Sequence, residues 1–188
     1  MSQAGLTAVD HHLLGILADG PAFGYQIIER LEARPHTLEV ATVGSVAVYQ
    51  ALAALEKRGW VSVTKQKVGT SQLRAEYDIS EAGRNALWLA TEQALREFPT
   101  SFTFRRGLAY AHVLSPGILA SRLRAARDDM ADRLAKISGA DLDGDPLVRR
   151  SLIANERDLL SGTLTWLGDL AEALEAEASR EFEVEESV

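Results

Sequence analysis

Three helix-forming segments, a β-prone hairpin and then further helices predict a mainly α fold. The expected architecture is an N-terminal winged helix-turn-helix with a two-stranded β wing, followed by a C-terminal helical dimerisation domain. Two more observations support it: basic residues gather at the hairpin, and apolar residues follow a heptad pattern along the last helix. We therefore expect two domains, over residues 6–98 and 99–180.

The composition is that of a globular protein. The 188 residues are 46% hydrophobic and 25% charged, which is enough apolar content for a folded core. The absence of cysteine excludes a disulfide scaffold and a thiolate metal site. No apolar run reaches the ~18 residues of a membrane span, and the first residues lack the basic start of a signal peptide. We therefore expect a cytoplasmic protein.

Capping and stop signals delimit three helices in the first part of the chain. The first is expected over Leu6–Ala18, because Thr7 can cap it and Asp10 can complete a capping box. The second is expected from about Phe23 to Ala33, and the third from about Ser45 to Arg58. The third helix places three apolar residues on one face, which are Val48, Leu52 and Leu55.

The hydrophobic period then changes from helical to alternating. Trp60–Lys67 and Ala75–Ile79 are β-prone, and Gly69–Ser71 between them is a turn signal, so a hairpin is expected. Ser80 is expected to cap a fourth helix, which runs to Phe98. Three helices followed by a hairpin is the element order of a winged helix.

The C-terminal part is expected to be helical. Pro99–Ser101 marks the domain boundary and precedes a helical segment over Phe102–His112. Serine before Pro116 and aspartate before Pro146 place each proline at the first position of a helix. We expect these helices to reach about Ser138 and about Ala178.

The last helix carries a heptad seam, with apolar residues at alternating steps of four and three. The candidate dimerisation residues on this seam are Leu160, Leu164, Leu167, Ala171 and Leu174. A homodimer is the favoured interpretation, and a contact within the chain's own helical bundle is the alternative. Leu159, Trp166 and Leu170 widen the apolar stripe, so the helix is expected to pack on more than one neighbour.

A recognition helix exposes small or polar residues at its N-terminal end, where it meets the edges of the bases. The segment from Thr42 to Gln50 has this character, and the positive end of the helix dipole favours phosphate there. The candidate DNA-binding residues are Tyr25, Thr42, Ser45, Tyr49, Gln50, Lys57, Lys65, Lys67 and Arg74.

The charge is unevenly distributed. The whole chain has a net charge of −7, and the part from Pro99 onward carries −5. Between Val43 and Arg74 the net charge is +4, with Glu56 as the only acid. Positive charge therefore gathers where the hairpin would lie on DNA, whose phosphates supply much of the affinity in such complexes. Alternatively, Lys65 and Lys67 only keep an edge hairpin soluble.

Residues 6–98 resemble the PadR family of transcription regulators. The segments that carry the resemblance are Leu14–Leu17, Gly20–Pro21, Gly24–Ile27, Val48–Leu52, Leu55–Val61 and Tyr77–Gly83. The resemblance implies a repressor that binds a pseudo-palindromic operator as a homodimer, with the C-terminal helices forming the dimer. Val46 and Ala47 stand where the family often has glycine and then serine or threonine, and Phe23 where histidine is common. These departures and the overall acidity leave a protein-interaction module without DNA binding as the alternative.

Some relatives in this family respond to phenolic or multidrug ligands, so the resemblance also suggests a small-molecule effector. The candidate pocket residues near the interdomain junction are Trp88, Tyr110, His112 and Trp166. The alternative is that these residues belong to the core. The sequence has no nucleotide-binding glycine motif, nucleophile elbow or HExxH zinc motif. We therefore expect no enzymatic activity, no cofactor and no metal site.

Overall fold

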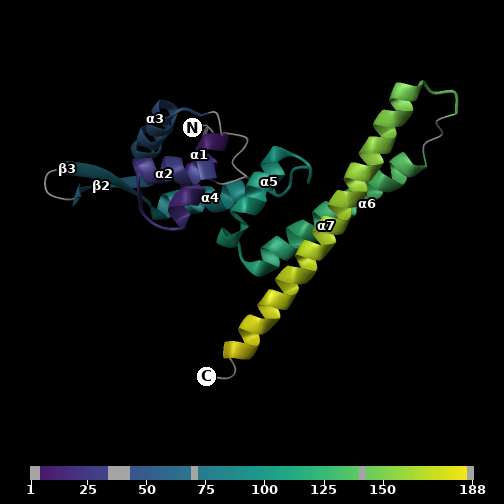
Figure 1. The fold of residues 1–188 in the computed structure, drawn as a ribbon. Helices are drawn as coiled ribbons and strands as arrows, with labels where there is room; N and C mark the ends of the chain where they lie inside the picture. Colours follow the sequence, from purple (N-terminus) through teal and green to yellow (C-terminus); the bar gives the residue numbers. More distant parts are fainter. Residues whose placement is uncertain (1–4, 34–42, 69–71, 140–142, 186–188) are drawn as a thin grey trace. The chain divides into compact units, whose positions relative to one another are not determined.

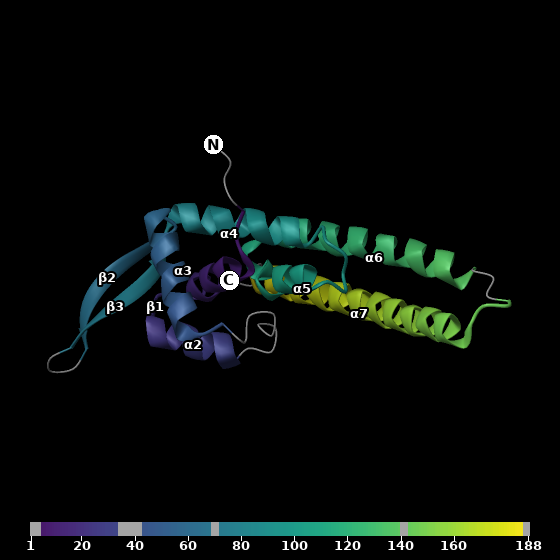
Figure 2. The same cartoon turned by 90° about the horizontal axis from the view of Figure 1, so that it is seen from above.

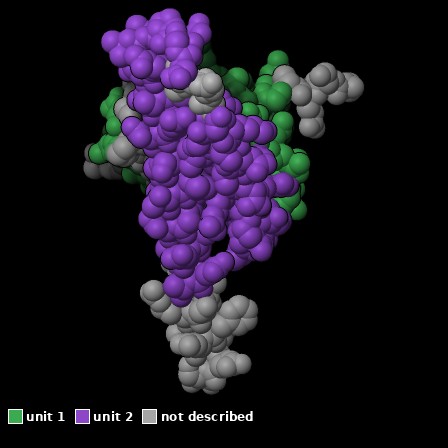
Figure 3. All heavy atoms as spheres, turned by 90° about the vertical axis from the view of Figure 1, so that its right-hand side faces the viewer, with its two compact units in different colours: residues 1–97, 101–114 green, residues 98–100, 115–188 purple. Residues whose placement is uncertain are grey.

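The computed structural model describes residues 5–33, 43–68, 72–139 and 143–185, with side chains described for all of these except residues 67, 68, 72 and 177–185. The fold is mainly helical with a small antiparallel sheet (Figure 1), which confirms the predicted fold class. The chain divides into two compact units, coloured separately in Figure 3. Unit 1 comprises residues 1–97 and 101–114, and unit 2 comprises residues 98–100 and 115–188.

Unit 1 contains the predicted helices and hairpin. Its elements are α1 (Ala8–Ala18), β1 (Ala22–Phe23), α2 (Gly24–Ala33), α3 (Ser45–Lys57), β2 (Val61–Val68), β3 (Gln72–Ile79), α4 (Glu81–Ala94), α5 (Phe102–Ala109) and the 3-10 helix η2 (Ala111–Val113). The hairpin of β2 and β3 projects from the helices of this unit in both Figure 1 and Figure 2. This is the shape of a winged helix.

Local hydrogen bonds set the ends of the first and third helices. The predicted capping box is present, since Thr7 Oγ1 accepts from Asp10 N and Asp10 Oδ2 accepts from Thr7 N, each at 3.1 Å. Gly59 follows α3 with φ +72°, in the left-handed region that glycine adopts without strain. Trp60 N then donates to Leu55 O at 3.0 Å, so a Schellman motif closes α3.

The sheet has the strand order β1-β3-β2. The hairpin pairs from Val61 opposite Ile79 to Val68 opposite Gln72, so β3 begins three residues before the predicted strand. Backbone pairing, which is independent of side-chain polarity, carries the strand through these polar residues. Phe23 was expected in a helix but lies in β1, because Gln26 Oε1 accepts from Phe23 N at 3.0 Å and α2 begins only at Gly24.

The core of unit 1 is formed around α1. Leu13, Leu14, Ile16 and Leu17 of α1 are buried together with the apolar faces of the other helices. The partners that α2, α3 and α4 contribute include Ile27, Leu31, Val48, Leu52, Leu55 and Leu87. The predicted buried face of α3 therefore holds this helix against the core and leaves its opposite face outside.

The elements after the hairpin differ from the prediction in their ends. Ser80 caps α4 as predicted, with Oγ accepting from Gly83 N at 3.0 Å, but α4 ends at Ala94 rather than Phe98. The segment expected as one helix to His112 is divided into α5 and η2 at Tyr110, whose φ is −119°. Residues 101–114 belong to unit 1, whereas we had expected the second domain to begin at residue 99.

Unit 2 is a helical hairpin of α6 (Pro116–Ser138) and α7 (Leu147–Glu185), which lie side by side in Figures 1 and 2. Pro116 is at the start of α6, as predicted. Leu123, Ala126 and Met130 of α6 are buried with Leu160 and Leu167 of α7. None of the described helices combines the length and hydropathy that a membrane span requires.

Candidate nucleic-acid interface

The N-terminal half of α3 presents an exposed face. Ser45, Val46, Tyr49 and Gln50 are exposed, whereas Val48 on the opposite side is fully buried. Residues four positions apart share a face of a helix, so Ser45 lies beside Tyr49 and Val46 beside Gln50. The helix begins after Gly44, which has no side chain, so the described structure has no side-chain cap hydrogen bond from the N-cap residue at this helix start. Thr42, the remaining candidate of this segment, lies outside the described residues.

Three of the predicted DNA-binding residues meet at one hollow of about 360 Å³. Tyr25 of α2, Tyr49 of α3 and Arg74 of β3 line it. The other residues of its lining are Phe23, Gly24, Leu73, Ala75 and Tyr77. The hollow therefore lies between the start of α2, the exposed face of α3 and strand β3 of the wing.

Side-chain contacts organise this hollow. The guanidinium carbon of Arg74 lies 5.3 Å from the centroid of the Tyr25 ring, a cation–π geometry. The Tyr25 ring in turn stacks on Phe23 at 6.0 Å with an interplanar angle of 7°. Gly24 lets the two helices approach, because a Cβ built there would lie 2.4 Å from the Tyr49 ring and 2.7 Å from its hydroxyl.

The pKa of the Tyr77 phenol, in the lining of the hollow, is raised. Burial raises its pKa above the usual value of 10.0, and the Tyr49 phenol and the Glu56 carboxylate add to the effect. The Tyr77 hydroxyl therefore keeps its proton at neutral pH and stays available as a hydrogen-bond donor.

The basic residues of the wing segment have different surroundings. Lys57 and Lys65 are exposed, and in the hairpin register Lys65 is opposite Ala75 and Lys67 is opposite Leu73. Arg58 is 3.7 Å from the Asp10 carboxylate and packs over Trp60 at 4.9 Å, so it stabilises the junction of α1 and α3.

An acidic residue also lies on the wing. Glu76, two positions beyond the segment with the +4 charge, hydrogen-bonds with Gln66 across the strands. The positive charge of the hairpin is therefore concentrated toward its outer part, at Lys65, Lys67 and Arg74.

Sequence reasoning missed several residues of the hollow. Phe23, Leu73 and Tyr77 all line it. The alternation of Leu73, Ala75 and Tyr77 along β3 is the signal that could have placed them on one side of the strand. No local pattern indicates the stacking of Phe23 on Tyr25, because both had been expected in one helix.

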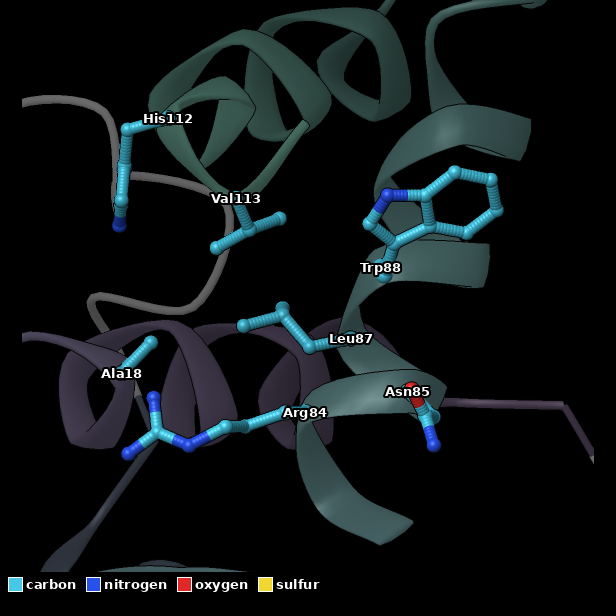
Figure 4. A pocket seen from close by; sticks show the side chains of 7 residues that line it. All are labelled: Ala18, Arg84, Asn85, Leu87, Trp88, His112 and Val113. Atoms are coloured by element: carbon cyan, nitrogen blue, oxygen red, sulfur yellow. The ribbon is translucent and has the colours of Figure 1, made fainter. Parts of the chain in front are cut away.

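A second hollow of about 340 Å³ lies in unit 1 (Figure 4). Figure 4 shows Arg84, Asn85 and Trp88 on α4, with His112 and Val113 across the opening. His112 Nε2 is 3.5 Å from Asp19 Oδ1. Two of the four predicted effector residues, Trp88 and His112, are therefore brought together.

The other two predicted effector residues have different positions. Tyr110 is fully buried and its hydroxyl is 2.8 Å from His12 Nδ1. Its ring lies against Gly15, where a built Cβ would be 2.2 Å away, so Tyr110 belongs to the core as the alternative interpretation had it. Trp166 is in unit 2 and is 42% exposed.

A buried polar network connects α1, α4 and α5. His11 is 3% exposed, and its Nε2 is 3.0 Å from Thr91 Oγ1. Arg106 Nε donates to His11 Nδ1 at 3.3 Å. Burial lowers the pKa of His11 from 6.5 to about 3, with Arg106 and His12 adding positive potential.

The heptad seam of α7 is used at least in part within the chain. Leu160 and Leu167 are each 1% exposed in the hairpin with α6, and Leu164, Ala171 and Leu174 are half-buried. A second stripe remains outside at steps of seven residues, with Leu152 63%, Leu159 50% and Trp166 42% exposed. The helix thus has two apolar faces, and α6 covers one of them.

The structure has the features of a winged helix-turn-helix protein. A helix with an exposed polar N-terminal face is held on a three-helix core and is followed by a hairpin with basic residues. Residues 13–88 match the model of the transcriptional regulator PadR-like family. This match confirms, over residues 13–88, the resemblance predicted from the sequence. A comparison with curated protein sequences found no match.

The solved structures that match this chain include one of a Clostridium thermocellum regulator and two of Bacillus subtilis PadR. A transcriptional regulator from Clostridium thermocellum is 28% identical, over 42% of this chain and 72% of that chain, with a TM-score of 0.37. Bacillus subtilis PadR in complex with operator DNA is 14% identical, over 89% and 99%, with a TM-score of 0.42. Bacillus subtilis PadR in complex with p-coumaric acid is 13% identical, over 89% and 96%, with a TM-score of 0.36.

Proposed function

We propose that the protein is a cytoplasmic, sequence-specific repressor that binds a pseudo-palindromic operator as a homodimer. The observation that carries this proposal is the family match over residues 13–88, which runs from the middle of α1 into the first half of α4. The exposed face of α3 and the basic hairpin are the features with which a winged helix contacts DNA. In this proposal α3 enters the major groove and the hairpin contacts the adjacent backbone or minor groove.

Gln50 is the best-placed base-reading residue of this interface. It is exposed on α3 next to Tyr49, and a glutamine amide can form a bidentate pair with adenine in the major groove. Ser45 and Lys57, at the two ends of α3, are assigned to the phosphates on either side.

The test is a binding-site selection with the full-length protein and random DNA, followed by titration of the selected duplex at several salt concentrations. We expect an inverted repeat, an affinity that falls as salt rises, and at least tenfold weaker binding to scrambled DNA. Gln50→Ala should lose preference at one base pair of each half-site while keeping the rest of the motif. Selection without enrichment of any sequence would contradict the proposal and favour a protein-interaction module.

We also propose that the dimer forms through the exposed stripe of α7, Leu152, Leu159 and Trp166, with the predicted seam residues contributing where α6 leaves them half-covered. Leu160 and Leu167 already have their apolar surface covered within the chain. A heptad stripe left uncovered on a long helix is the feature that a second helix buries in a coiled coil.

The hollow of Figure 4 is our proposed effector site. It combines the Trp88 ring, the apolar side chains Leu87 and Val113, and the Arg84 guanidinium, a set that suits a small planar molecule with a carboxylate. The probe is p-coumaric acid, the ligand named for Bacillus subtilis PadR. We expect it to quench tryptophan fluorescence and weaken DNA binding in the wild type but not in Trp88→Leu with Arg84→Ala. An identical response of the variant would place the effector elsewhere.

A further inference from the structure

The hollow between α2, α3 and β3 has the chemistry of an anion site. Among the described residues that line it, Arg74 is the only charged one and none is a carboxylate. A guanidinium presents planar pairs of N–H donors that match two oxygens of a phosphate. The Tyr49 hydroxyl lies at the Gly24 edge of the same hollow, where it can donate a further hydrogen bond.

The position of Arg74 is set by an aromatic ring. Its guanidinium lies 5.3 Å from the centroid of Tyr25, and Tyr25 itself stacks on Phe23. An exposed arginine on a strand of a hairpin otherwise samples many rotamers, and ordering it only at the moment of binding costs affinity. The ring face of Tyr25 reduces this cost by holding the guanidinium near its working position.

The surroundings of the hollow indicate which anion it receives. One wall is the exposed face of α3, and another is β3 of the wing. If these two elements enter neighbouring grooves, the DNA backbone that separates the grooves must pass between them. A backbone phosphate is therefore the anion that this location would meet.

We propose that Tyr25 positions Arg74 so that Arg74 and Tyr49 together bind one backbone phosphate of each DNA half-site. This inference rests on the proposed function and deepens it. Tyr25 acts through its ring face and is a positioning residue, so its hydroxyl is dispensable. In this proposal Tyr49 contacts the DNA backbone rather than the bases, and its neighbour Gln50 contacts the bases.

The test uses the full-length protein and the selected duplex, with each phosphate of one half-site replaced in turn by a neutral methylphosphonate. In the wild type one replacement at the groove boundary should weaken binding about tenfold, the loss expected for a charged hydrogen bond. Arg74→Ala should lose about the same factor on unmodified DNA and become insensitive to that replacement. Arg105→Ala, an exposed arginine of α5 with the same charge change, is the matched control and should retain the sensitivity.

Variants of Tyr25 separate positioning from direct contact. Tyr25→Phe keeps the ring and should bind as the wild type does, whereas Tyr25→Leu should weaken binding about three- to fivefold. Tyr25→Leu combined with Arg74→Ala should be no weaker than Arg74→Ala alone, because the two residues act as a unit. Unchanged melting temperatures would confirm that these variants fold.

Several results would overturn the inference. Equal losses in Tyr25→Phe and Tyr25→Leu would assign the contact to the hydroxyl. A changed sequence motif in Arg74→Ala would make the arginine a base-reading residue. If the wild type selects a motif but all these variants bind normally, only the phosphate site is wrong, whereas a wild type that selects no DNA contradicts the proposed function itself.

Discussion

Hydrogen bonds fix the protonation state of His11. The Nε–H group of Arg106 can only donate, so Nδ1 of His11 carries a lone pair and the ring proton is on Nε2, which donates to Thr91 Oγ1. A second proton would displace the arginine contact and leave two positive charges side by side in a buried site. The geometry and the lowered pKa therefore agree that His11 is neutral in the folded protein.

We predict that this histidine makes unit 1 less stable in acid. Its pKa is about 3 in the folded protein and 6.5 for an ordinary histidine, so the unfolded chain binds more protons between these pH values. The contribution to stability is complete above pH 6.5 and declines by about 1.4 kcal/mol per pH unit as the pH falls toward 3. Urea unfolding from pH 7 to pH 4 measures it.

His11→Gln is the control for this acid sensitivity. A glutamine side chain can still accept from Arg106 and donate to Thr91, but it does not titrate. The difference in unfolding free energy between variant and wild type should therefore grow in favour of the variant as the pH falls below 6.5. Parallel pH profiles for the two proteins would show that the histidine is not the acid-sensitive group.

Single residues show where sequence reasoning succeeds and where it ends. The period of Val48, Leu52 and Leu55 is local, and it correctly gave the buried face of α3 and thus its exposed one. The contact of Tyr25 with Arg74 depends on how α2 and the wing fold together, so no spacing in the sequence encodes it. The sequence identified Tyr25, Tyr49 and Arg74 of the hollow, but it gave neither their pairing nor the other two aromatic residues of the lining.

At the scale of elements, the junction between the hairpin and α4 depends on a glycine. A Cβ added to Gly83 in the first turn of α4 would lie 2.1 Å from the backbone oxygen of Trp60. Ser80 Oγ donates to Gly59 O at 2.7 Å in the same junction, so the helix start and the end of α3 are tied together. Because the backbone of Trp60 and the backbone of α4 meet at Gly83, neither can shift easily to make room for a side chain there.

We therefore predict that Gly83→Ala destabilises the protein by about 1–3 kcal/mol through overpacking. Gly168→Ala in α7 is the matched control, because nothing lies within 4 Å of a Cβ built there and the residue is on the opposite side of the helix from Leu159 and Trp166. That variant should gain about 0.5–1 kcal/mol from helix propensity alone. Thermal melts followed by circular dichroism compare the two, and a stable Gly83→Ala would mean that α4 does not pack on Trp60 as described.

The wing is the element with the clearest electrostatic prediction. Lys65→Ala with Lys67→Ala should weaken binding to all DNA sequences alike and flatten the slope of log affinity against log salt by roughly one unit per lost phosphate contact. The motivation is the net charge of +4 between residues 43 and 74. Lys136→Ala with Arg150→Ala, both exposed in unit 2, makes the same charge change away from the wing. An unchanged slope in the wing variant would remove the hairpin from the contact surface.

At the scale of the molecule, the heptad pattern predicted that α7 packs on a partner, but not which partner takes which face. Leu160 and Leu167 are buried within the chain, in the hairpin with α6. Part of the seam that was predicted to form a dimer interface is therefore already covered in a single chain. A pattern of spacing encodes the need to bury a stripe, and two helices of one chain meet that need as well as two chains do. The same ambiguity explains the boundary, since the apolar residues of α5 pack on the winged helix although they follow its expected end.

The two faces of α7 give opposite predictions for the whole protein. Leu152→Glu with Leu159→Glu places charges on side chains that are 63% and 50% exposed in the single chain, so each chain should stay folded. In a dimer through this stripe the carboxylates would be buried unpaired, at a cost of several kcal/mol, and the dimer should dissociate. DNA binding should then fall steeply, because two half-sites about 34 Å apart need two linked DNA-binding domains.

Leu160→Glu instead places a charge in the contact with α6 and should unfold the hairpin of unit 2. Sedimentation measures the dimer, circular dichroism the helices and a gel shift the DNA binding. If the variant with Leu152→Glu and Leu159→Glu remains dimeric, the interface is formed by the half-buried seam residues, and Leu164→Glu with Leu174→Glu tests that alternative. A folded monomer that binds the full operator with native affinity would contradict the proposed dependence of DNA recognition on dimerisation.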